Sequence, residues 1–275
     1  MKTQTLKVPG ATIYYETRGS GPVLLMIAGG GTDAGVFEAI APILAEDYTV
    51  VTYDPRGNSR SPLDNTPEDQ SIAIHSDDAS RLLEAVTPEP AIVFGTSSGA
   101  IVGLDLIARH PERVAKLIAH EPPLLEILPD SATWHAVNEH VYEIYQREGA
   151  GAAMNAWAVG VGLEGTMQPP AVPLPPEVAA TMARMAGNMD LFFGHELLPF
   201  THYRPNLTLL SAHKERIVLA GGLETRDHLA GKFAYRPAAL LAEHLDTQVV
   251  EFPGDHGGYG AHAVTFAAKL HEILK

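Results

Sequence analysis

Short, mostly apolar runs recur along the chain, at residues 23–27, 49–52, 91–94, 114–118, 217–220 and 247–251. Runs of this kind, without polar alternation, are typical of strands that helices cover on both faces, as in a parallel sheet. Ahead of them, residues 3–8 and 12–17 alternate between apolar and polar around Pro9-Gly10. That alternation predicts an opening β-hairpin.

Helical patterns lie between these runs, at residues 36–45, 77–86, 98–110, 237–244 and 262–274. In the helix expected after Phe94, Ile101, Leu104 and Ile107 fall on one side, and Pro111 stops the helix. Strands that alternate with helices of this length are typical of βαβ units. The sequence therefore predicts an α/β fold with a mostly parallel, doubly wound sheet.

One region, residues 122–211, contains no strand-like run. It holds an expected helix at 132–148, a small-residue stretch at 149–165, a proline-rich connection at 169–176 and a further helix from Glu177. About 90 residues are too many for an ordinary loop. We therefore expect a helical cap at 122–211, inserted into a core that comprises 1–121 and 212–275, with apolar and aromatic residues that suit the roof of a pocket.

The net charge of the chain limits the classes of partner that we expect it to bind. The 275 residues include 33 acidic and 19 basic side chains, a formal net charge of −14. An acidic surface repels phosphate backbones and anionic lipid headgroups, so we expect neither nucleic acid nor a membrane as a partner. The sequence shows neither a signal-peptide pattern nor an apolar run near the roughly 20 residues that span a bilayer. The expectation is a cytoplasmic protein whose oligomeric state is unknown.

The sequence predicts neither a cofactor nor a metal. It has no P-loop, a common nucleotide signature. It also has no cysteine, which excludes disulfides, thiolate nucleophiles and cysteine-ligated zinc. His135 and His140 are five residues apart, a poor spacing for a chelating pair on a helix, and Pro199 interrupts an H-E-x-x-H motif at His195.

A candidate nucleophile stands between an expected strand and an expected helix, in Gly95-Thr96-Ser97-Ser98-Gly99. A sharp turn that lifts a serine hydroxyl off a strand end strains the backbone, and side chains two positions away on either side would collide. The helix that begins at Ser98 points its N–H groups and dipole toward negative charge that forms at Ser97. This G-x-S-x-G pattern is therefore typical of a nucleophile elbow.

Three further motifs accompany this turn at matching spacings: Ala28-Gly29-Gly30-Gly31, Tyr53-Asp54-Pro55-Arg56-Gly57-Asn58-Ser59-Arg60-Ser61 and Gly254-Asp255-His256-Gly257-Gly258. With them, nearly the whole chain outside the expected cap resembles the α/β-hydrolase family, in its capped, esterase-like form. The resemblance implies an α/β-hydrolase fold, an oxyanion loop at 28–31, an organising turn at 53–61 and a catalytic histidine in the last loop. Ala28 replaces the family's usual histidine, which is tolerable because the oxyanion donor is a backbone N–H.

The resemblance implies roles for four residues. Ser97 would be the nucleophile, and His256 would be the base that removes its proton, because a serine hydroxyl is a poor nucleophile by itself. The backbone N–H groups of Gly30 and Ser98 would form the oxyanion hole. Only a neutral imidazole accepts the proton, so activity is expected to rise with pH through the range in which histidine titrates.

The acid that orients His256 lies between Ser97 and His256 in the chain order of this fold. Glu121 ends an expected buried strand beside two prolines, where a desolvated carboxylate needs a partner. Glu224 follows the 217–220 run in a polar stretch, where many family members keep an aspartate. We favour Glu121 and retain Glu224 as the alternative acid.

The predicted function is that of a serine hydrolase. It would cleave an ester or lactone of a small, moderately apolar substrate through an acyl-enzyme on Ser97. A serine at this position argues against a haloalkane dehalogenase or epoxide hydrolase, whose members of this fold place an aspartate there. Carbon–carbon bond hydrolysis, cofactor-free perhydrolysis and a non-catalytic small-molecule receptor of the same fold remain alternatives.

Overall fold

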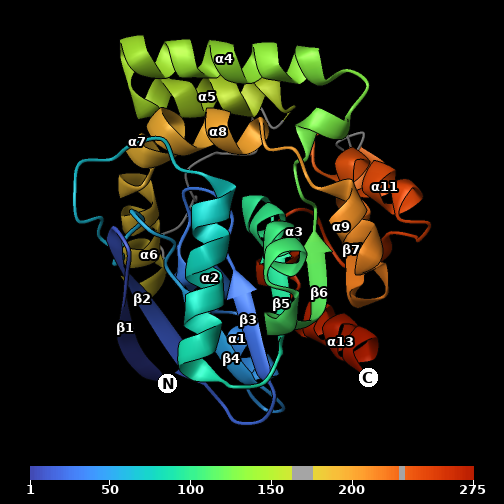
Figure 1. Ribbon diagram of the computed structural model, residues 1–275. Helices are drawn as coiled ribbons and strands as arrows, with labels where there is room; N and C mark the ends of the chain where they lie inside the picture. Colours follow the sequence, from blue (N-terminus) through green and yellow to red (C-terminus); the bar gives the residue numbers. More distant parts are fainter. Residues whose placement is uncertain (163–175, 229–232) are drawn as a thin grey trace.

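An eight-stranded sheet forms the centre of the protein, in the strand order β1-β2-β4-β3-β5-β6-β7-β8. The structure, a computed structural model, describes residues 1–162, 176–228 and 233–275 (Figure 1). β1 and β2 form the expected hairpin and β2 pairs antiparallel with β4, whereas the pairings from β4 to β8 are parallel. The strands are β1 (Lys2–Val8), β2 (Ala11–Arg18), β3 (Val23–Ile27), β4 (Thr49–Tyr53), β5 (Ala91–Thr96), β6 (Val114–His120), β7 (Ile217–Gly222) and β8 (Val250–Phe252).

Helices follow the strands along the described parts of the chain. They are α1 (Ala41–Leu44), α2 (Ile72–Val86), α3 (Ser98–Arg109), α4 (Ser131–Glu148), α5 (Ala150–Gly160), α6 (Pro176–Gly187), α7 (Met189–Leu191), α8 (Leu197–Thr201), α9 (Leu207–Ala212), α10 (Leu223–His228), α11 (Tyr235–His244), α12 (Gly258–Ala261) and α13 (Ala263–Leu274). The prediction of a mostly parallel, doubly wound α/β sheet is confirmed. Within the described ranges, no helix combines the length and apolar character that crossing a membrane requires.

The two faces of the sheet bury separate apolar cores. In β3, Leu25 and Ile27 belong to the core that α2 and α3 cover, whereas Leu24 and Met26 belong to the core that α1 and α13 cover. Figure 1 shows α2 and α3 in front of the strands. Burial on both sides explains why the strand sequences are continuously apolar.

Helices α4 to α8, here called the cap helices, lie between β6 and β7 in the chain. Figure 1 shows α4 and α5 above α7 and α8, over the sheet end to which the arrows of β3 and β6 point. The expected helix at 132–148 corresponds to α4, and most of the small-residue stretch forms α5. The proline-rich connection falls almost wholly outside the described residues, and the domain boundaries at 122 and 211 stay a prediction.

Candidate active site

Ser97 occupies the sharp turn between β5 and α3. Its backbone has φ 55° and ψ −130°, and its N–H donates to the carbonyl oxygen of His120 at 3.0 Å. A Cβ on Gly95 would lie 2.3 Å from the carbonyl oxygen of Gly99, and one on Gly99 would lie 2.3 Å from that of Ile27. Both contacts are with backbone atoms, so the turn admits only glycine at these two positions.

Glu121 and His256 meet at the carboxyl ends of β6 and β8. Nδ1 of His256 is 2.5 Å from Oε2 of Glu121, and the N–H of Gly222 donates to Oε1 at 2.8 Å. The Glu121 side chain is fully buried, whereas that of His256 is 37% exposed. An Nδ1–H that donates to this carboxylate leaves the lone pair on Nε2, the nitrogen that can accept a proton.

Two electrostatic effects keep Glu121 charged. Burial by itself would raise the pKa of Glu121, but the hydrogen bond and charge of His256 and the hydrogen bond from Gly222 together lower it. Burial also lowers the pKa of His120 to about 4, which leaves this neighbouring ring neutral. His120 therefore adds no positive charge that would compete with His256 for the carboxylate.

Glu224, the alternative acid, lies elsewhere. Its side chain is about half exposed, and Oε1 is 3.8 Å from Nε2 of His262. Only its backbone reaches the histidine loop, through an N–H that donates to the carbonyl oxygen of Gly254 at 2.9 Å. Of the two candidate acids, the structure brings Glu121 to His256 and leaves Glu224 at the surface.

One cavity of about 250 Å³ brings the remaining candidate residues together. Gly30, Ser97, Ser98 and His256 line it. The cap helices and the turn before α8 contribute apolar walls, made by Met154, Trp157, Met189, Phe192, Leu197 and Phe200. The cavity therefore combines a few polar groups with a mainly apolar lining, as small-molecule sites do.

The loop 28–31 lies directly against the candidate nucleophile. A Cβ on Gly29 would be 3.0 Å from Cβ of Ser97. Thr32 donates to the carbonyl oxygen of Gly29 through its hydroxyl at 2.6 Å and its N–H at 3.3 Å. The Gly29 carbonyl and the Gly30 N–H belong to one peptide group and point in opposite directions. Thr32 therefore sets the direction of the Gly30 N–H. Sequence analysis missed this residue, whose only signal is a hydroxyl after three glycines.

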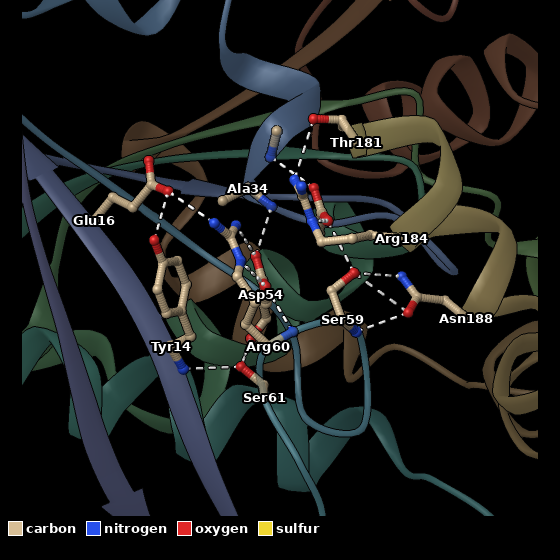
Figure 2. A network of polar contacts seen from close by, with 12 residues as sticks. Tyr14, Glu16, Ala34, Asp54, Ser59, Arg60, Ser61, Thr181, Arg184 and Asn188 are labelled. Carbon is tan, nitrogen blue, oxygen red and sulfur yellow. Dashed lines mark hydrogen bonds and ion pairs between the residues drawn. The ribbon is translucent and has the colours of Figure 1, made fainter. Parts of the chain in front are cut away.

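A polar network surrounds Asp54 and Ala34, shortly after this loop in the chain (Figure 2). Asp54 accepts hydrogen bonds from the Ala34 N–H at 3.0 Å and from Nε of Arg60 at 2.7 Å. Arg184, from α6, donates through Nε to Oδ2 of Asp33 at 2.9 Å. The 53–61 turn and a cap helix therefore both contact residues 33 and 34, which follow the loop closely in the chain.

A cluster of possible metal ligands, which sequence analysis did not predict, lies away from this cavity. Glu126, His135 and His202 each place a ligand atom within 4.8 Å of the others. Nε of Arg204 donates to Glu126 at 2.8 Å, and the two imidazoles stack with centroids 4.1 Å apart. Nε2 of His135 also lies 2.9 Å from Oε1 of Glu126, so this carboxylate already pairs with an imidazole and a guanidinium.

Comparisons with known proteins agree with the fold. A family model described as alpha/beta hydrolase fold matches residues 22–152. YraK of Bacillus subtilis (strain 168), an uncharacterized hydrolase, is 41% identical over 275 residues, which cover 98% of this chain and 95% of YraK. The chain therefore belongs to the α/β-hydrolase family, as its sequence motifs predicted, and is a hydrolase of that family.

Solved structures show the same fold at low identity. A thermophilic esterase from Thermogutta terrifontis, with malate bound, has a TM-score of 0.76 at 19% identity, over 98% of each chain. Est816, described as an N-acyl homoserine lactone degrading enzyme, has a TM-score of 0.71 at 20% identity, over 98% of this chain and 100% of its own. At these identities the likeness establishes the architecture alone.

Proposed function

We propose that the protein is a serine hydrolase that cleaves an ester or lactone of a small, moderately apolar substrate. The observation that carries this proposal is the hydrogen bond between Glu121 and His256, together with the cavity that His256 and Ser97 both line. A buried carboxylate, an imidazole and a hydroxyl on a strained turn are the three parts of a serine hydrolase triad.

The reaction would proceed in two halves. Nε2 of His256 takes the proton of Ser97 as Oγ attacks the carbonyl carbon, and the N–H groups of Gly30 and Ser98 hold the developing oxyanion. The proton then passes to the leaving alcohol oxygen as the carbon–oxygen bond breaks, which leaves an acyl-enzyme on Ser97. In the second half His256 takes a proton from water as the water oxygen attacks the acyl carbon. The proton then passes to Oγ of Ser97 as the acyl carbon–Oγ bond breaks, and the carboxylic acid leaves.

The cavity supports the proposed substrate class. Its volume of about 250 Å³ is near the lower end for small-molecule sites, and its lining is mostly apolar. A compact acyl group with little charge would fit these walls, whereas a large polar chain would leave buried polar groups without partners. Carbon–carbon bond cleavage and perhydrolysis would use the same residues, so a substrate panel has to include them.

A fluorophosphonate probe tests the nucleophile directly. The wild-type protein should be labelled at Ser97, and Ser97→Ala should abolish both labelling and hydrolysis of short p-nitrophenyl esters and lactones. Ser211→Ala is the matched control, because Ser211 is an exposed serine in α9 that does not line the cavity. A folded wild-type protein that refuses the probe would support the receptor alternative and overturn the proposal.

A further inference from the structure

Three consecutive glycines form the candidate oxyanion loop, so side chains outside it must fix its backbone. Thr32 orients the peptide group that carries the Gly30 N–H. The next two peptide groups flank Gly31, whose φ is +66°. Both have partners on side chains that follow α6, Asn188 and Glu196, far along the chain from the loop.

Glu196 faces the N–H side of Gly31. It ends the π-helical turn Phe192–Glu196, and its side chain is 1% exposed. Nδ2 of Asn58 donates to Oε1 at 3.0 Å, and the backbone N–H of Gly31 faces the same carboxyl group closely enough to lower its pKa. Glu196 thus links the 53–61 turn to the loop. Isolated π-helical turns of this kind are frequent at functional sites.

Asn188 holds the carbonyl side of Gly31. Its Nδ2 donates to the Gly31 carbonyl oxygen at 3.2 Å and to Oγ of Ser59 at 3.0 Å, while its Oδ1 accepts from the Ser59 N–H at 2.7 Å. Figure 2 shows Asn188 beside Ser59. Asn188 is also buried, at 4% exposure. Asn58 and Ser59 are neighbours in the chain, so one turn anchors both side chains.

We propose that Glu196 and Asn188 are positioning residues for hydrolysis: they hold the two peptide groups that flank Gly31 and thereby fix the direction of the Gly30 N–H. The proposal rests on the proposed function, because it gives that N–H an oxyanion to bind. Its consequence is that the oxyanion hole is complete only when the segment after α6 is seated on the core. The cap would then contribute to transition-state stabilisation as well as to substrate binding.

Packing supports the same conclusion. A Cβ on Gly31 would be 2.3 Å from Cε of Met189, and one on Gly30 would be 2.6 Å from the ring of Phe192. Both side chains lie between Asn188 and Glu196 in sequence. The segment 188–196 therefore covers the loop with apolar atoms while its two buried polar ends hold the backbone, an arrangement that excludes water from the loop's hydrogen bonds.

Steady-state kinetics on a short p-nitrophenyl ester tests the proposal. Glu196→Ala and Asn188→Ala should each lower kcat by about 10- to 100-fold with KM within about 3-fold, because the interaction lost is made in the transition state. Glu196→Gln keeps an acceptor oxygen and should restore kcat to within about 3-fold of wild type. His195→Ala is the matched control on the same turn, because its side chain pairs with Asp69 at the surface.

Hydrogen exchange of residues 28–33 supplies a readout that does not depend on turnover. Exchange should accelerate in Glu196→Ala and Asn188→Ala and stay at the wild-type rate in His195→Ala. If both alanine variants keep wild-type kcat, or if exchange in the loop is unchanged, the positioning role is wrong. If exchange responds while the wild-type protein hydrolyses no ester, the loop is held as described and the proposed function fails instead. If Glu196→Ala does not fold, Glu196→Gln takes its place, and its kcat must then match that of the wild-type protein.

Discussion

Glu121 and His256 are 135 positions apart in the chain, yet Oε2 of the carboxylate lies 2.5 Å from Nδ1 of the imidazole. The contact depends on an uncommon backbone conformation, because Glu121 has φ 49° at the end of β6. Its N–H donates to the Ala220 carbonyl oxygen at 2.9 Å, which ties this bend to β7. This geometry supports the proposal that Glu121 is the triad acid.

Replacing Glu121 by Gln tests that role. The variant keeps the shape of the side chain but removes the charge that orients His256, so kcat should fall by about 10²–10⁴-fold. Glu224→Gln is the control, since its carboxylate is near His262, and its kcat should stay within about 2-fold of wild type. Initial rates on one p-nitrophenyl ester suffice. The opposite ranking of the two variants would move the acid to Glu224.

Local signals in the sequence predicted the sheet and the nucleophile turn, because short apolar runs and paired glycines report backbone environment directly. The predicted ends of helices and strands were less accurate where a side-chain cap or the extent of strand pairing sets them. The helix expected at 36–45 is split, because Asp33 accepts from the Gly35 N–H and caps a separate turn at Ala34–Phe37. β8 covers Val250–Phe252 instead of 247–251, since it pairs only with Ala220–Gly222 of β7.

Contacts across long stretches of chain could not be predicted in the same way. Asn58 and Glu196 are 138 residues apart, and no periodicity connects a polar turn with a carboxylate in an apolar segment. Sequence analysis treated His195-Glu196 only as a failed zinc motif. The choice between Glu121 and Glu224 was likewise open, because both follow predicted strands and only the register of β6, β7 and β8 distinguishes them.

The glycines of the turn give a stability prediction. Gly99→Ala places a Cβ 2.3 Å from the Ile27 carbonyl oxygen, a backbone atom that cannot move aside, so unfolding free energy should fall by about 1–3 kcal/mol. Gly151→Ala, in α5, meets nothing within 4 Å and should be neutral or stabilising by about 0.4–1 kcal/mol. Urea denaturation measures both. Equal stabilities for the two variants would contradict the close packing at the turn.

The buried carboxyl group of Glu196 should make the stability of the folded protein depend on pH. Burial raises its pKa to about 7 from an ordinary 4.5, against the opposing effects of the Asn58 hydrogen bond and the nearby Gly31 N–H. Between these two values the folded state keeps a proton that the unfolded state releases, so the wild-type protein loses stability as pH rises through this window. Glu196→Gln does not titrate and escapes that loss.

Denaturant unfolding of wild type and Glu196→Gln at pH 5 and pH 8 measures this difference. The stability of the variant relative to wild type should increase by on the order of 3 kcal/mol between the two pH values, since other titrating groups cancel in the comparison. His195→Ala should show no comparable change relative to wild type. A constant difference between Glu196→Gln and wild type would show that Glu196 does not ionise in this range.

The position of Met189 predicts that its replacement by alanine changes which acyl chain length the enzyme prefers. The 250 Å³ cavity and a neighbouring groove of about 430 Å³ share Thr32, Met154 and Met189, and the groove also contains Met182 and Met185. Met189 stands where the two meet, so Met189→Ala should open a path for a longer acyl chain. Each methylene that becomes buried contributes about 0.8 kcal/mol, or roughly 4-fold in kcat/KM.

A series of p-nitrophenyl esters with acyl chains of increasing length measures this effect. The optimum chain length should increase in Met189→Ala, with a gain of about 10-fold or more in kcat/KM for esters two methylenes longer than the wild-type optimum. Met182→Ala lies in the groove but not on the cavity wall, and its optimum should match wild type. An unchanged optimum in Met189→Ala would mean that acyl chains do not pass this side chain, and that the groove plays no part in choosing the substrate.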